Sequence, residues 1–174
     1  MAAYAVCVRL QTFVLMPHTG ISQGLQPIVG YNAGRGLMGR ALRARNLALG
    51  SSLVYGAVTA AALAVLAHPV SGLFLNDPAA VDNAARALRV LALGMTVAGL
   101  APLVAAYSQS MGRPAPAYLL TLGTLLLIKI PLVATLGRLG AEGLWAALAA
   151  GEAAGAIVAL WLMRRLRDAT PQAS

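Results

Sequence analysis

Long apolar stretches alternate along the chain with shorter segments that hold most of its charged residues. A helix needs about 20 mainly apolar residues to cross a lipid bilayer, and five stretches meet this length, at about 2–34, 46–67, 90–111, 115–137 and 143–163. Lys129 interrupts the fourth stretch and Glu152 interrupts the fifth. The pattern predicts an all-α, polytopic membrane helix bundle with about five transmembrane helices.

Composition favours a membrane protein over a soluble one. Of the 174 residues, 59% are hydrophobic and 10% are charged, whereas a typical globular chain has about 25% charged residues. The polar side chains are too few to cover a water-facing surface of this size, and a disordered chain would not hold so much apolar area. We therefore expect the lipid bilayer to be a partner of this chain.

The chain has a net charge of +8. The positions of its basic residues fit a membrane topology and do not fit a nucleic-acid-binding surface. Aromatic side chains are not interleaved with the arginines, as base stacking would need, so we expect no nucleic-acid partner. Residues 35–45, Arg113 and the C-terminal tail hold eight basic residues, while 68–89 and Arg138 hold three. The positive-inside rule then predicts an external N-terminus and a cytoplasmic C-terminus.

Signatures of an enzyme or of a metal site are weak. The single cysteine, Cys7, excludes an intramolecular disulfide and a multi-cysteine metal site. His18 has no second ligand at metal-binding spacing and is expected to be a packed side chain, and His68 is expected at the membrane interface. Ser22, Ser108 and Ser110 have no His or Asp at a supporting spacing. We predict that the chain is not an enzyme and has no cofactor and no metal site.

Glu152 and Lys129 are charged residues inside apolar stretches. An ionisable group at the centre of a helix costs about 3 kcal/mol on insertion scales and normally faces the bundle interior. Lys129 lies eight residues before Gly137, and Glu152 lies nine residues after Gly143. Both are thus roughly 12–14 Å from the external ends of two antiparallel neighbouring helices. This predicts an ion pair, either as a static internal contact or with a role in a transport cycle.

The first stretch places Gln23, Gln26 and Gly30 on one helical face. Pro17 and Pro27 in the same stretch each remove a backbone hydrogen bond and bend the helix. Amide side chains and freed carbonyls on such a face can line a polar cavity. They can equally bond neighbouring helices while the glycine permits close packing. Both interpretations stay open.

Three other polar residues of this stretch have expectations of their own. Tyr31 and Asn32 are expected to close the helix at the cytoplasmic interface, where tyrosine is favoured. Arg9 lies about two turns inside a helix that starts at Ala2. Its position indicates an interior partner or chain that precedes the first residue.

Three segments resemble the multidrug and toxic compound extrusion (MATE) family. Residues 20–34, GISQGLQPIVGYNAG, are similar to the stretch that closes the second helix of that family's C-terminal lobe. Residues 109–114, QSMGRP, resemble a family turn, and residues 139–145, LGAEGLW, resemble the entry to the last helix. The resemblance extends over essentially the whole chain. It implies that 1–167 form most of a C-terminal lobe, helices eight to twelve of twelve, and that 168–174 form a polar cytoplasmic tail.

The resemblance also implies a function. Members of the family are antiporters that extrude drugs or toxic organic compounds, typically small amphipathic organic cations, coupled to Na⁺ or H⁺ entry. Alternating access requires two lobes that rock against each other, so an N-terminal lobe, in the same chain or separate, is an expected partner and the chain is expected to be a fragment. The transport-pathway candidates are Gln23, Gln26, Tyr31, Asn32, Gln109, Lys129 and Glu152.

Two alternatives to the antiporter remain at this point. A lipid-linked oligosaccharide flippase shares the superfold, although more cationic residues than Arg9 and Lys129 would be expected on its cavity-facing helices. A truncated product that transports nothing is the other alternative. The Ala-rich, Arg-rich and Lys-poor composition suggests a bacterium with GC-rich DNA, which places the protein in the inner membrane.

Overall fold

The computed structural model of the chain describes residues 2–168, and this part is helical with no strand. The main helices are α1 (Ala2–Gly34), α2 (Met38–Gly72), α3 (Pro78–Met95), α4 (Leu100–Ser110) and α7 (Ala141–Asp168). Between α4 and α7 the chain forms α5 (Pro114–Tyr118), η1 (Leu119–Gly123), η2 (Leu125–Lys129), α6 (Ile130–Leu136) and η3 (Gly137–Leu139). The prediction of an all-α bundle is confirmed. The predicted tail, 168–174, lies outside the described residues after Asp168.

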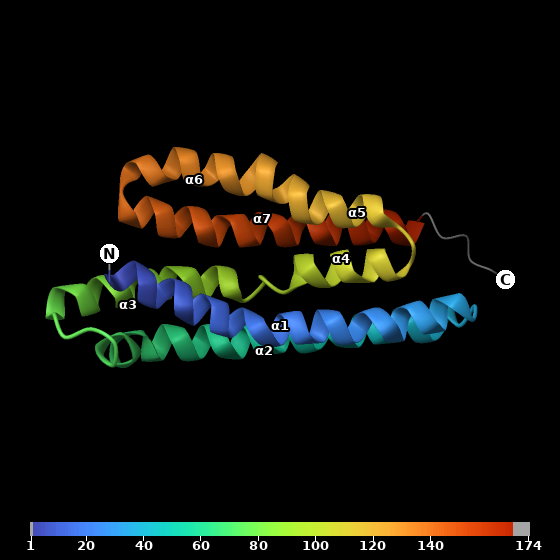
Figure 1. The fold of residues 1–174 in the computed structure, drawn as a ribbon, viewed down its shortest axis with the longest axis horizontal. Helices are drawn as coiled ribbons and strands as arrows, with labels where there is room; N and C mark the ends of the chain where they lie inside the picture. The colour runs from blue at the N-terminus through green and yellow to red at the C-terminus, as the bar shows by residue number, and fades with distance from the viewer. Residues whose placement is uncertain (1, 169–174) are drawn as a thin grey trace.

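The helices pack side by side in layers (Figure 1). α3 and α4 follow one another along the middle of the bundle. α1 and α2 cover one side of this middle layer, and the hairpin of 114–139 and α7 covers the other. The middle layer is thus the part of the chain that contacts both flanking pairs.

The two ends of the bundle differ in charge. The turns at 35–37 and 111–113 and the last turn of α7 lie at one end, and the 73–77 loop and the turn at Gly140 lie at the other (Figure 1). At the first end Arg45 stacks over Tyr107 at 5.2 Å, and Arg165 stacks over Trp161 at 4.6 Å. The segments that the positive-inside count assigns to one side therefore do lie at one end of the bundle.

Four helical spans of the described chain are long and apolar enough to cross a membrane: Met38–Gly72, Pro78–Ser110, Pro114–Leu139 and Ala141–Arg165. α1 has 33 residues and is long enough as well. It is not among the four because glutamines, Arg9 and His18 lower its hydropathy. The structure thus has five long spans, one of which is more polar than the rest.

α2 extends beyond the apolar stretch 46–67 at both ends. It begins at Met38 and continues through Pro69 to Gly72, so the arginines at 40, 43 and 45 lie on its first turns and not in a loop. Arginine is a good helix former and keeps its charged end in water while its stem lies along the helix. The arginines in 35–45 therefore indicate where the membrane span ends, while the helix itself continues beyond that point.

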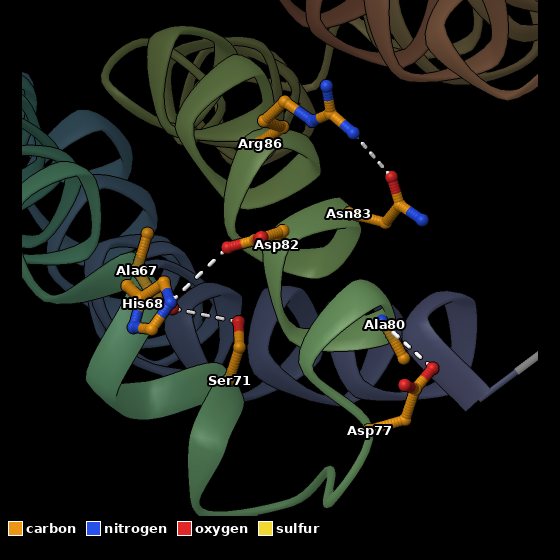
Figure 2. Close-up of polar contacts among 8 residues, drawn as sticks. All are labelled: Ala67, His68, Ser71, Asp77, Ala80, Asp82, Asn83 and Arg86. Atoms are coloured by element: carbon orange, nitrogen blue, oxygen red, sulfur yellow. Dashed lines mark hydrogen bonds and ion pairs between the residues drawn. The ribbon is translucent and has the colours of Figure 1, made fainter.

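α3 starts much earlier than the stretch 90–111 suggests. The sequence Asn76-Asp77-Pro78, which has the composition of a turn, is a helix start: the Asp77 carboxylate accepts a hydrogen bond from the Ala80 N–H at 3.2 Å, and Pro78 occupies the first helical position (Figure 2). Both features are typical of a helix N-terminus. The connection is therefore 73–77 rather than 68–89, and Arg86 and Arg89 lie on the helix.

Polar contacts lie at the corner between α2 and α3, and the contact of His68 with Asp82 joins the two helices (Figure 2). The His68 Nε2 atom lies 3.3 Å from the Asp82 carboxylate, and both side chains are largely exposed. The Ser71 hydroxyl donates to the Ala67 carbonyl at 2.7 Å. These contacts place His68 at a bundle end, which agrees with its expected interfacial position.

The stretch 90–111 contains a break between α3 and α4, at residues 96–99. Here α1 and α2 approach the chain so closely that a Cβ atom on Gly99 would overlap the side chains of His18 and Ser52. On the α2 side, a Cβ on Gly56 would lie 2.6 Å from the Thr96 carbonyl oxygen. Glycine is required at both places because backbone or side-chain atoms occupy the space of a side chain.

Candidate functional site

The ion pair predicted inside the helices is present. The Lys129 Nζ atom lies 2.7 Å from the Glu152 Oε1 atom, and it donates a hydrogen bond across the interface between η2 and α7. The two side chains are 33% and 20% exposed, respectively. The pairing prediction is confirmed, whereas the role of the pair in transport stays a prediction.

Local backbone structure positions the lysine. Lys129 is the last residue of a π-helical run, Leu119–Gly123 and Leu125–Lys129, in which the helix is wider than an α-helix. π-Helical turns are rare and frequently occur at functional sites. The lysine stem then crosses α7 at Gly151, where a Cβ atom would lie only 3.1 Å from the Lys129 Cγ atom. Gly151 therefore keeps open the path by which Lys129 reaches Glu152.

Small residues at helical spacing from Glu152 on α7 pack inward. Gly155, Ala156 and Ala159 are buried, and a Cβ on Gly155 would lie 3.8 Å from the Ala101 side chain of α4. Ala149, one turn before Glu152, lies close to α3: a Cβ on Gly94 would be 2.8 Å from the Ala149 Cα atom. Close approach of α7 to the middle layer holds Glu152 at the inner face of the hairpin.

A cavity of about 240 Å³ adjoins the ion pair. Three elements line it, namely α4, the π-helical run and α7, through Ala101, Pro102, Leu120, Thr121, Thr124, Leu125, Lys129, Glu152 and Gly155. The Thr121 hydroxyl donates to the Ala117 carbonyl at 2.9 Å, and the Thr124 hydroxyl donates to the Leu120 carbonyl. The cavity is thus mainly apolar, with a carboxylate and an ammonium group at one side.

Gln26 and Gln109, two of the sequence candidates, are brought together. The Gln26 amide donates to the Gln109 side-chain oxygen at 3.5 Å, the long limit of a hydrogen bond, and so links α1 to α4. A Cβ on the neighbouring Gly30 would lie 3.9 Å from the Ser110 carbonyl. This geometry agrees with the interpretation that these residues join helices. Gln23 is exposed on α1 and has no hydrogen-bond partner among the described residues.

Tyr31 and Asn32 lie at the end of α1, as expected. The Asn32 side chain donates to the Ile28 carbonyl at 2.7 Å, and the Asn32 carbonyl accepts from the Leu37 N–H at 2.8 Å. The Tyr31 hydroxyl accepts from the Arg35 guanidinium at 2.8 Å. These contacts close the helix and its turn. Gln26, Tyr31, Asn32 and Gln109 therefore lie toward the basic end, and neither they nor Gln23 line the cavity beside Lys129 and Glu152.

Sequence reasoning missed a buried polar cluster at the α3–α4 break. His18 is 2% exposed, its Nδ1 atom lies 2.7 Å from the Ser52 hydroxyl, and its ring meets Tyr55 edge to face at 5.1 Å. Tyr55 in turn donates to the Val14 carbonyl at 3.2 Å. A packed histidine was expected, but its partners on α2 could not be identified because they are 34 and 37 positions away with no shared motif.

These features define the class of protein. Five long helical spans, an apolar exterior and an ion pair between helices together describe a multi-pass membrane protein. The MatE family model matches residues 1–135. The chain therefore belongs to the MatE family, as the three segments of its sequence indicated.

Curated relatives agree with this assignment. The chain is 28% identical over 166 residues to the FAD transporter of Shewanella oneidensis and 27% identical over 170 residues to the multidrug export protein MepA of Staphylococcus aureus. A probable multidrug resistance protein NorM of Burkholderia mallei is 29% identical over 184 residues. The alignments cover 95–96% of this chain but 37% of each relative. The chain thus spans little more than a third of the length of these relatives.

Solved structures share the fold. A MATE transporter VcmN variant of Vibrio cholerae superposes with a TM-score of 0.88 at 19% identity, over 96% of this chain and 39% of that chain. The MATE transporter ClbM, solved in complex with Rb⁺, superposes with a TM-score of 0.84 at 29% identity, over 96% of this chain and 40% of that chain. The helix order described above is therefore that of one part of a MATE transporter.

Proposed function

We propose that this chain is part of a transporter that extrudes drugs or toxic organic compounds across a bacterial inner membrane. The observation that supports it most strongly is the Lys129–Glu152 pair beside a cavity of about 240 Å³ between membrane helices. Ionisable residues within membrane spans are costly and commonly mark ion or substrate pathways. The names of the MepA and NorM relatives support drug export as the class of activity.

Cation coupling, by Na⁺ or H⁺, is the second element of the proposal. Glu152 lies in the middle of a span, whereas Asp77, Asp82 and Glu142 lie at or near the starts of α3 and α7. A carboxylate that is released from Lys129 can take up a proton or a monovalent cation. The Rb⁺ complex of ClbM supports monovalent cations as ligands in this family.

The chain would form one wall of a cleft for small organic cations, and an N-terminal lobe would form the other. Alternating access by rocking of two halves needs both. We place the C-terminus and the arginine-rich end of the bundle in the cytoplasm, by the positive-inside rule. An oligosaccharide flippase and a non-transporting product remain the alternatives to an antiporter.

Export of a flavin nucleotide is a second candidate function. The relative in Shewanella oneidensis is named an FAD transporter, and its alignment covers 95% of this chain at 28% identity. Such a substrate is an aromatic anion and not an organic cation. The two candidates therefore differ in the charge that the transport pathway must accept.

The test compares Glu152→Gln with Glu142→Gln in the whole polypeptide that contains this chain. Glu142 is exposed at the start of α7 and serves as a matched control. We expect cation-driven efflux of ethidium from everted membrane vesicles to fall at least about tenfold for Glu152→Gln, because the variant removes the internal carboxylate and leaves Lys129 without its partner. Unchanged efflux in Glu152→Gln, with wild-type expression, would contradict the proposed role of the pair.

A further inference from the structure

Arg9, a cation on α1, has no counter-ion in the part of the chain that the structure describes. Its side chain is exposed, about 10 Å along the helix from Ala2 at 1.5 Å per residue. Two ion pairs occur among the described residues, His68–Asp82 and Lys129–Glu152, and neither includes Arg9. A charged residue inside a membrane helix normally has a partner or faces a polar pathway. The Lys129–Glu152 pair therefore does not explain why an unpaired arginine lies in α1.

A recess of about 430 Å³ lies against this arginine. Residues of α1 and the loop after α2 line it, namely Ala5, Val6, Arg9, Leu10, Phe13 and Phe74. The volume lies within the range of small-molecule sites, about 300–1,000 Å³. Both phenylalanines of the chain line the recess, and they are 72% and 59% exposed. One guanidinium group thus stands among apolar and aromatic walls.

The chemistry of these walls selects one class of ligand. A guanidinium group presents a planar fork of donors that matches phosphate and carboxylate groups. The two phenyl rings and the aliphatic side chains favour a flat apolar body next to that anionic group. We propose that the Arg9 recess binds an organic anion in which a phosphate or carboxylate is attached to an aromatic or apolar body.

Neither an acidic residue of the described chain nor an organic cation suits the Arg9 recess. The acid nearest in sequence to the recess wall at Phe74 is Asp77, and its carboxylate already accepts from the Ala80 N–H as the cap of α3. An organic cation would be repelled by an arginine whose charge is uncompensated. Two sources can supply the anion: a dissolved solute, or the headgroup of an anionic lipid at the bundle end where the recess lies.

This inference deepens the flavin-nucleotide candidate proposed above by naming the site and the ligand class. It is argued from Arg9 and its neighbours, and its test measures binding without transport. If transport assays showed no efflux, the recess could still bind the anion. Failure of the binding test would in turn leave export of organic cations untouched.

The test compares two ligands that differ by a single phosphate group. The full chain in phosphatidylcholine nanodiscs is titrated with flavin mononucleotide and with riboflavin, and binding is followed by flavin fluorescence anisotropy. We expect flavin mononucleotide to bind at least about tenfold more tightly, because a charge-assisted hydrogen bond is gained only with the phosphate. Arg9→Gln should abolish this preference, and Arg9→Lys should retain part of it.

Arg138→Gln is the matched control, because Arg138 is an exposed arginine that does not line the recess. It should leave the preference unchanged. Phe13→Leu should weaken both flavins alike, since it removes a ring but no charge. Nanodiscs with phosphatidylglycerol distinguish the sources: competition that depends on Arg9 identifies a lipid headgroup, and its absence identifies a dissolved anion. Equal affinity for the two flavins, or a preference that survives Arg9→Gln, would overturn the proposal.

Discussion

The spans Pro78–Ser110 and Pro114–Leu139 have almost the same hydropathy and opposite surroundings. In an apolar 18-residue window of each span the mean hydropathies are 1.9 and 2.1, yet 67% of the residues in the first window are buried inside the bundle, compared with 11% in the second. Hydropathy therefore shows that a helix can cross a membrane but not what surrounds it. The difference lies in the size of the side chains.

The central span, Pro78–Ser110, is rich in alanine and glycine, and other helices approach its backbone directly. Gly94 accommodates Ala149 of α7, and Gly99 accommodates His18 of α1. Small residues let helix backbones come close, and close packing rather than water exclusion drives helix association in lipid. The central span is enclosed because its surface admits neighbours on both sides.

The outer span, Pro114–Leu139, is rich in leucine and presents these side chains outward. Leu122, Leu126 and Leu127 are all at least half exposed. It packs against α4 and α7, and the Lys129–Glu152 pair is one of its contacts with α7. Large apolar side chains suit contact with lipid, whereas Lys129 of the same span pairs with Glu152 of α7.

The largest effect should follow from filling the α3–α4 break. Gly99→Ala places a methyl group where His18 and Ser52 already lie, and overpacking of this kind costs about 3 kcal/mol. In the outer span, Gly123→Ala meets only an ordinary contact, with the Leu119 Cγ atom at 3.5 Å. It should be neutral or slightly stabilising, because alanine is the better helix former.

The free energy of unfolding in mixed detergent micelles, titrated with sodium dodecyl sulfate, measures both variants. Addition of His18→Ala to Gly99→Ala should restore part of the lost stability by removing the colliding ring. Equal stability of Gly99→Ala and Gly123→Ala would contradict the enclosed position of the break.

Leucine truncation in the two spans gives the next effect. Leu103 is 1% exposed, and Leu103→Ala should lower the free energy of unfolding by about 2–3 kcal/mol, since a cavity remains among packed neighbours. Leu127 is 76% exposed, and lipid or detergent can fill the space that Leu127→Ala leaves. We expect a loss below about 0.5 kcal/mol for this control. The same detergent titration compares the two, and similar losses would contradict the difference in burial.

The ion pair should contribute a coupling energy of about 1–2 kcal/mol between the outer span and α7. Lys129→Met and Glu152→Gln should each destabilise the protein, while the double variant should cost less than the sum because no buried charge is left alone. A double-mutant cycle in the detergent titration measures this term. Lys129→Glu and Glu152→Lys should each impair insertion of the protein into the membrane. The double variant, in which the two charges are exchanged, should restore insertion. Additive single effects would show that the two side chains do not pair.

The smallest effect concerns the polar cluster beneath the break. Ser52→Ala removes the hydroxyl that meets His18 at 2.7 Å, which should cost about 1 kcal/mol. The neighbouring Ser51 is exposed on the same helix and serves as a matched control. Ser51→Ala should change the free energy of unfolding by no more than a few tenths of a kcal/mol. Equal losses in the two variants would exclude the His18–Ser52 hydrogen bond as a source of stability.

Much of the architecture could be predicted from the sequence because it depends on local chemistry. The span 2–34 follows from its long uncharged run, and the Lys129–Glu152 pair follows from equal depth in adjacent helices. The starts of α2 and α3 were harder to predict. The arginines at 40, 43 and 45 mark a change of environment but lie within α2, and Asn76-Asp77-Pro78 has the composition of a turn but begins α3.

The features around the candidate site were only partly predictable, because most of them depend on contacts between segments that are distant in the sequence. The break at 96–99 depends on side chains of α1 and α2 that lie more than 40 positions away, so no periodicity in 90–111 reveals it. The π-helical run likewise has no compositional signal among leucines. Gln26 and Gln109 could be chosen by resemblance to the family, but their contact depends on how α1 crosses α4.

Carbene footprinting of the unmodified chain measures directly which of the two spans faces lipid. A diazirine-bearing lipid in nanodiscs labels side chains that face the bilayer, and mass spectrometry locates the label. We predict several-fold more label in 114–139, on residues such as Leu126 and Leu127, than in 78–110, where the exposed Leu93 is the main exception. Equal labelling of the two spans, or heavier labelling of Leu88 and Leu103, would contradict the account.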